Sequence, residues 1–119
     1  SEVDDSKAVL TKRTAEADSL KSRVEFDLRT AYLDIEAATN QVHAAQSAVA
    51  LANQTVTLAQ DRFAAGVTDS VEVVQAQQTL AVSNEGYISS LFALNAARAN
   101  LAHATGNAEQ MIKRFFGGR

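Results

Sequence analysis

Two histidines are the first residues in this chain whose chemistry could build a metal or catalytic site. His43 and His103 are the only histidines among 119 residues, and there is no cysteine. An antiparallel pairing of the chain about residue 66 would bring His43 near residue 89, roughly 20 Å along a helix from His103. A zinc site needs three or four converging ligands. We therefore expect no metal site and no cofactor.

Pairs of carboxylates are the next candidates, because two of them can act together as general acid and base. Asp34 and Glu36 are two positions apart, as are Glu16 and Asp18. Residues at this spacing do not face each other on a helix. The segment Gly66-Val67-Thr68-Asp69 lacks the lysine and the glycine spacing of a phosphate-binding loop. The sequence therefore predicts that the chain is not an enzyme.

The composition excludes further classes of protein. The chain is 46% hydrophobic and 21% charged, its formal charge is −3, and it has no proline. A small negative charge without a basic, aromatic-rich stripe argues against nucleic-acid binding. No apolar run approaches the length of a membrane-spanning helix, and the acidic start at residues 1–5 does not look like a signal peptide. The absence of proline favours long, uninterrupted helices.

The clearest break in the chain is at Gly66. A glycine is the preferred residue just after a helix, and the residues Thr68-Asp69-Ser70 that follow are all good helix N-caps. We therefore predict two long helices, at about 5–65 and 70–104, joined by a tight turn. The fold class is all-α, a long antiparallel coiled-coil helical hairpin.

The end of the chain has a weaker break at Gly106-Asn107. Because asparagine is a common N-cap, Asn107 is a candidate start for a short C-terminal helix at about 107–115. We expect residues 1–119 to form a single helical-hairpin domain with its tip turn at 62–72.

Apolar residues repeat every seven positions in both helices, in two rows that we call the large row and the small row. The large row comprises Leu28, Ile35, Val42, Val49, Val56 and Phe63 in the first helix, and Val73, Leu80, Tyr87, Leu94 and Leu101 in the second. The small row comprises Val24, Ala31, Ala38, Ala45, Ala52 and Ala59, and Ala76, Ser83, Ser90, Ala97 and Ala104. This pattern predicts a coiled-coil seam between the two helices.

A further apolar strip, which we call the outer row, is rotated away from that seam. It comprises Ala37, Ala44, Leu51, Leu58 and Ala65 in the first helix, and Val74, Ala81, Ile88 and Ala102 in the second. Two strips allow a helix to contact neighbours on two sides, as in a ring or sheet of helices. A plain antiparallel bundle with one broad apolar face is the alternative, and periodicity alone does not decide between them.

The residues around the turn resemble the outer-membrane efflux protein (TolC-like) family. Three motifs follow one another in the order seen in that family: Arg62-Phe63-x-x-Gly66, Val71-Glu72-Val73 and Ala76-x-x-x-Leu80. Glutamate replaces the commoner aspartate in the second motif. Segments 31–34 and 101–106 are similar to the flanking helices of the family, so that the resemblance covers about residues 20–106.

The resemblance implies a part in transport. Members of the family form trimeric outer-membrane channels with a periplasmic helical tunnel, and they dock with a periplasmic adaptor (membrane fusion) protein and an inner-membrane transporter. The chain would be one periplasmic hairpin of an outer-membrane protein in a Gram-negative type envelope. It has no segments resembling barrel strands, so we expect a fragment that does not itself span the membrane.

The resemblance also implies that the tip binds the partner. The candidate residues are Arg62, Phe63, Gly66, Val67, Thr68, Asp69, Ser70 and Glu72. The alternative is that Gly66 and Asp69 only cap helices and that Arg62 is a solvated charge or a partner of Asp69.

A second functional hypothesis is a soluble coiled-coil interaction module that forms a four-helix bundle by dimerisation. In either case an isolated hairpin would leave its second strip uncovered. We expect it to bury that strip by dimerising or by bending the first helix back over the second.

Overall fold

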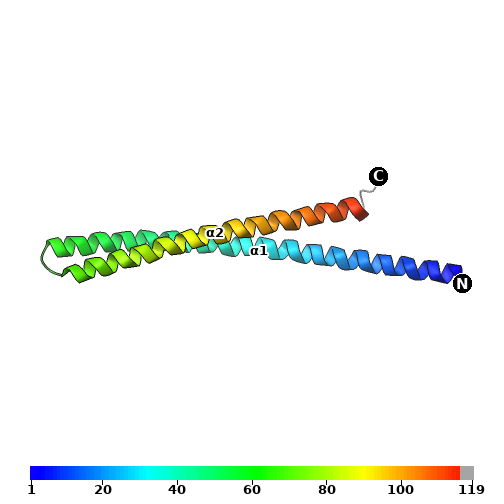
Figure 1. Ribbon diagram of the computed structural model, residues 1–119, viewed down its shortest axis with the longest axis horizontal. Coiled ribbons are helices and arrows are strands. Elements are labelled where there is room, and N and C mark those ends of the chain that lie inside the picture. The colour runs from blue at the N-terminus through cyan, green and yellow to red at the C-terminus, as the bar shows by residue number, and fades with distance from the viewer. Residues whose placement is uncertain (116–119) are drawn as a thin grey trace. The chain divides into compact units, whose positions relative to one another are not determined.

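The computed structural model describes residues 1–115, all of which are helical except Ser1 and the turn residues 65–69. Helix α1 spans Glu2–Ala64 and helix α2 spans Ser70–Phe115 (Figure 1). No strand occurs within these residues. The predicted fold class, two long helices joined at Gly66, is confirmed. The end of the expected 1–119 domain, residues 116–119, lies outside the described part.

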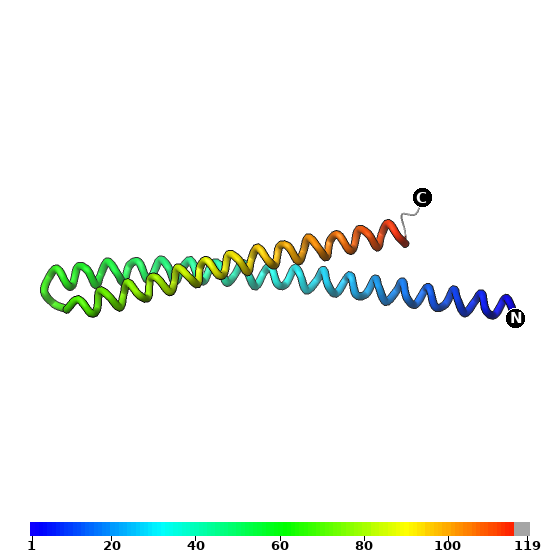
Figure 2. Tube along the Cα trace, viewed as in Figure 1, coloured from blue at the N-terminus to red at the C-terminus, as the bar shows by residue number. Residues whose placement is uncertain are grey.

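The contacts between the helices divide the chain into two compact units. The turn unit is Ile35–Ala97, and the terminal unit is Ser1–Asp34 with Arg98–Arg119. In the turn unit the two helices lie side by side and run in opposite directions, as the trace shows (Figure 2). Each unit is therefore an antiparallel helix pair with its own contacts.

The core of the turn unit follows the predicted seam. Its central cluster is formed by Ala38, Val42, Leu94 and Ala97, against which Ile35 and Tyr87 pack. The small row is buried at seven further positions of the two units, namely Val24, Ala31, Ala52, Ala59, Ala76, Ser90 and Ala104. Small side chains here allow the helices to lie close together, because the distance between helix axes depends on the side chains at the contact.

The outer row, in contrast, lies in solvent. Leu51 and Leu58 on α1 are 65% and 59% exposed, and Val74 and Ile88 on α2 are 58% and 54% exposed. The first helix does not bend back to cover them, since α1 is continuous from Glu2 to Ala64. That part of the expectation is wrong.

Helix α2 is longer than predicted and there is no separate helix at 107–115. It continues through Gly106 to Phe115, because a glycine inside a helix costs only about 1 kcal/mol relative to alanine. The seam also continues, since Ala108 and Met111 extend the large and small rows and are half-buried.

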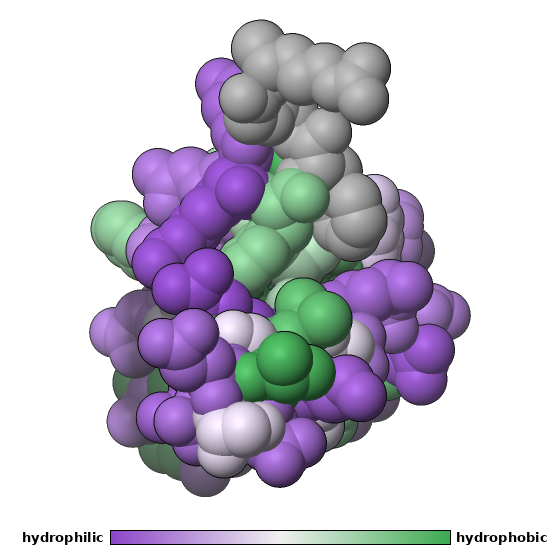
Figure 3. Space-filling view, turned by 90° about the vertical axis from the view of Figure 1, so that its right-hand side faces the viewer, coloured by the Kyte–Doolittle hydropathy of each residue, from purple (hydrophilic) through white to green (hydrophobic). Residues whose placement is uncertain are grey.

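The terminal unit differs from the turn unit in its charge. Its α1 part, residues 1–34, contains eight acidic and six basic side chains. The view from the side of the termini accordingly shows mainly hydrophilic residues around a smaller apolar patch (Figure 3). No helix within residues 1–115 has a stretch apolar enough to cross a bilayer.

Candidate partner-binding site at the turn

The end of α1 is fixed by two backbone hydrogen bonds. The N–H of Val67 donates to the carbonyl oxygen of Arg62, and the N–H of Gly66 donates to that of Phe63, both at 3.0 Å. Gly66 has a φ of 75°, the left-handed conformation that glycine adopts without steric cost. This is the Schellman arrangement, and it confirms Gly66 as the residue that ends the first helix.

The start of α2 is fixed by a side chain. The backbone N–H of Val71 donates to the carboxylate of Asp69 at 3.1 Å. Since α2 begins at Ser70, Asp69 is the N-cap, as predicted, and satisfies one of the free donors of the first turn. The acidic side chain of Glu72 in that first turn also interacts favourably with the positive end of the helix dipole.

An ion pair joins the end of α1 to the start of α2 across the turn. The Nε of Arg62 lies 3.3 Å from Oε1 of Glu72. The partner of Arg62 is thus Glu72 and not Asp69, whose carboxylate caps α2. Both side chains are between a third and a half exposed, so the pair contributes only about 0.2–1 kcal/mol.

The heptad pattern contained the information needed to find this pair. Arg62 directly precedes the large-row residue Phe63, and Glu72 directly precedes the large-row residue Val73. In an antiparallel pair, equivalent positions beside the seam lie on the same side and can form ion pairs.

Apolar side chains are exposed around this fixed turn. Phe63 is 50%, Val67 64% and Val71 56% exposed. In many Schellman turns the residue at the position of Val67 packs on an apolar residue of the last helical turn. In this chain the corresponding residues of α1 are Asp61 and Arg62, which are charged. Phe63 and Val67 are among the residues predicted from the sequence, whereas Val71 entered that prediction only as part of a motif.

The remaining predicted site residues complete the turn. Thr68 is half-buried, whereas Gly66 and Ser70 are exposed. All eight predicted residues therefore belong to one continuous segment at the junction of α1 and α2, stabilised by backbone bonds, one cap and one ion pair.

The outer rows of the turn unit lie at its two outer edges. In α1 the outer row follows the large row by two residues, and in α2 it follows by one. Because an α-helix turns by 100° per residue, each outer row lies about 130° around its own helix axis from the middle of the seam. The rotation from seam to outer row, viewed along the chain, has one sense in α1 and the opposite sense in α2. When two helices run antiparallel, rows displaced in opposite senses lie on opposite sides of the pair. The two apolar strips therefore occupy opposite corners of the helix pair.

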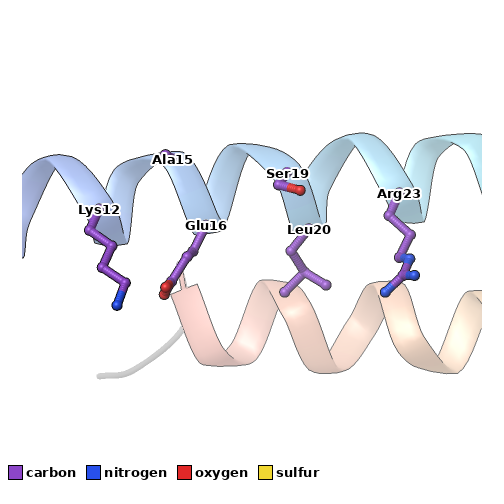
Figure 4. Close-up of a pocket in the computed structure, with 6 residues that line it drawn as sticks. All are labelled: Lys12, Ala15, Glu16, Ser19, Leu20 and Arg23. Carbon is purple, nitrogen blue, oxygen red and sulfur yellow. The ribbon is translucent and has the colours of Figure 1, made fainter.

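The histidine and carboxylate side chains of residues 1–115 are not gathered at one place. No cluster of three His, Cys, Asp or Glu side chains occurs there. The two histidines belong to different units and both are exposed. The terminal unit has an open hollow along α1, where Glu16, Leu20 and Arg23 point toward α2 and Lys12 points to the same side beyond the end of α2 (Figure 4). Its opposite charges do not converge on one point.

These features define the class of protein as an all-α coiled-coil hairpin with a hydrogen-bonded turn and an uncovered second apolar strip. The family model of the outer membrane efflux proteins matches residues 2–110. The chain therefore belongs to the outer membrane efflux protein family, a family of transport channels, which confirms the resemblance of its turn. No curated protein and no solved structure is significantly similar to the chain.

Proposed function

We propose that the chain is a periplasmic helical hairpin of an outer-membrane efflux channel, where it forms part of the wall of the helical tunnel. The turn at 62–72 docks with a periplasmic adaptor protein, and the adaptor joins the channel to an inner-membrane transporter. In this proposal residues 1–119 act as one hairpin domain of a larger, trimeric protein.

The observation that carries the proposal is the uncovered outer row. Leu51 and Leu58 are exposed at one edge of the turn unit, and Val74 and Ile88 at the other. Apolar residues repeated along an edge indicate a contact with another helix. Because the two strips lie on opposite corners, each edge would meet a different neighbour. Such head-to-tail contacts form a ring where the rotation between neighbours closes, and a ring is the arrangement that a tunnel wall requires.

The scarcity of charge in the same unit supports this proposal. Residues 37–60 contain no Asp, Glu, Lys or Arg, and residues 73–97 contain only Glu85. A helix surrounded by water normally carries more charged side chains. A surface of amides and small residues suits contacts with other helices or the lining of a water-filled passage.

The proposal is tested by placing charge on one edge of the unit in the full-length channel protein. We expect Leu51→Lys combined with Leu58→Lys to abolish the trimer, because two ammonium groups would have to be buried between helices. The matched control is Asn53→Lys combined with Gln60→Lys, which adds the same charge at two exposed positions on a different side of α1. Size-exclusion chromatography with light scattering measures the oligomer, and circular dichroism checks that the helices persist.

The alternative, a four-helix bundle of two hairpins, gives a different result. A bundle would have a two-fold interface, so that the wild-type protein would be a dimer and not a trimer. A trimer that survives both lysines would also contradict the proposal.

A further inference from the structure

We propose that helix α2 contains a flexible joint at residues 82–90, where it opens locally while the facing part of α1 stays helical. The inference concerns the hairpin itself and does not depend on the proposed place of the chain in a channel. Such a joint allows the turn unit to bend in α2 without breaking the seam contacts of Ala76 and Ala97 on either side of it.

The joint segment consists mainly of residues that form helices poorly. Glycine in the middle of a helix is unfavourable because it loses more backbone freedom on folding than any other residue, and Gly86 lies inside α2. Glu85 is the one strong helix former of the segment. The other members, all weaker than alanine, leucine or glutamine in a helix, are Val82, Ser83, Asn84, Gly86, Tyr87, Ile88, Ser89 and Ser90.

The part of α1 that faces this segment has the opposite composition. Because the helices run antiparallel, the hydrogen bond between the side chains of Gln46 and Tyr87 places residues 44–52 of α1 across from about residues 81–89 of α2. Seven of the nine residues 44–52 are alanine, leucine or glutamine, which are among the best helix formers. A local opening at this level therefore takes place in α2, with α1 as the stable partner.

The seam also contributes less at this level than beside it. Three consecutive seam positions of α2 carry hydroxyl groups, at Ser83, Tyr87 and Ser90, and no other residue of the large and small rows does. Ser83 and Tyr87 are half-buried, whereas Ala76 and Leu94 on the two sides of the segment are 6% and 8% exposed. Opening the segment therefore removes little apolar area from burial, and it returns the hydroxyl groups to water.

Hydrogen bonds do little to hold the segment against α1. The hydroxyl of Ser90 donates to the carbonyl oxygen of Tyr87 in its own helix, at 2.7 Å, and a serine bonded in this way competes with the helix backbone. Apart from the ion pair at the turn, residues 1–115 contain one hydrogen bond between side chains of the two helices, from Nε2 of Gln46 to the hydroxyl of Tyr87. At 3.4 Å it is longer than a typical hydrogen bond, so it adds little resistance to opening.

Hydrogen exchange of the backbone amides measures local opening directly. The experiment uses the full-length protein that contains this chain, with exchange followed by mass spectrometry on short peptides. We expect residues 82–90 to exchange at least about tenfold faster than residues 44–52. They should also exchange faster than residues 73–80 and 94–101, which flank the joint in the same helix.

Two glycine variants distinguish a joint at this place from general looseness of α2. Gly86→Ala is expected to slow the exchange of residues 82–90 about fivefold, because alanine stabilises a helix interior relative to glycine and its side chain would meet no atom within 4 Å. The matched control is Gly106→Ala, which lies in α2 with equally free space but belongs to the terminal unit. It should leave the exchange of residues 82–90 unchanged, and circular dichroism checks that both variants remain folded.

Each of three outcomes overturns the inference. Equal exchange in residues 82–90 and in the flanking parts of α2 would show that the helix opens as a whole. Faster exchange in residues 44–52 would place the weaker segment in α1. If Gly86→Ala has no effect, or Gly106→Ala has the same effect, residues 82–90 are not an independent joint. None of these results depends on the oligomer or on an adaptor, so the proposed function stands or fails separately.

Discussion

The buried seam and the outer row of the turn unit contain the same kinds of residue in opposite environments. Ala59 is 2% exposed, whereas its neighbour Leu58 is 59% exposed. Inside the hairpin the small row is mostly alanine, with eight alanines among its eleven residues, and several large aliphatic side chains lie outside. The hairpin is therefore formed by close approach of backbones, and much of its apolar area remains for contacts beyond the pair.

The largest expected effect is on the few large residues of the seam. Leu94, which is 8% exposed, packs with Ala38, Val42 and Ala97. We expect Leu94→Ala to lower the free energy of unfolding of the chain by about 2–3 kcal/mol, because it leaves a cavity. Leu58→Ala should cost less than about 0.5 kcal/mol in the monomeric hairpin. Urea unfolding followed by circular dichroism measures both, and equal losses would contradict the distinction between the two strips.

A second test enlarges a residue where space is limited. Ala59→Leu would push the helices apart, and we expect a loss of about 1–3 kcal/mol in the free energy of unfolding. The same change at the exposed outer-row residue Ala44 should be nearly neutral. Thermal unfolding of the two variants decides the matter, since tolerance of leucine at position 59 would show that the seam is not closely packed.

The smallest effect comes from changes that leave both strips intact. Gly66→Ala places a side chain at a positive φ, and we expect a loss of about 1 kcal/mol. Gly86 lies inside α2, and a side chain there would meet nothing within 4 Å. We therefore expect Gly86→Ala to raise the free energy of unfolding by about 0.5–1 kcal/mol. Melting temperatures that shift in the same direction for both variants would contradict the expectation that alanine is unfavourable at Gly66 and favourable at Gly86.

Much of the fold could be predicted from the sequence, because the heptad rows and the break at Gly66 are local patterns. The rows anticipated which residues would be buried: Val24, Ala31, Val42 and Leu94 are all below 9% exposed. The cap at Asp69 followed from residue preference at helix starts.

The end of α2 and the partner of Arg62 could not be predicted from single residues, because each depends on contacts between the two helices. Gly106-Asn107 has the composition of a helix boundary, yet the seam contacts of Ala108 and Met111 continue α2. To predict that Arg62 pairs with Glu72 and not with Asp69, one must know on which side of its helix each residue lies. A helix end predicted from residue types must therefore be checked against the heptad rows, which can continue past that position.

The tight connection between α1 and α2 restricts how a hairpin of this kind can change in length during evolution. Inserting a single residue into either helix would rotate every later side chain by about 100° and move the alanines out of the seam. The turn has no spare residues to absorb such a shift, because its hydrogen bonds join Arg62 directly to Val67 and Asp69 to Val71. Longer or shorter relatives should therefore differ by whole heptads, gained or lost in both helices at the same level.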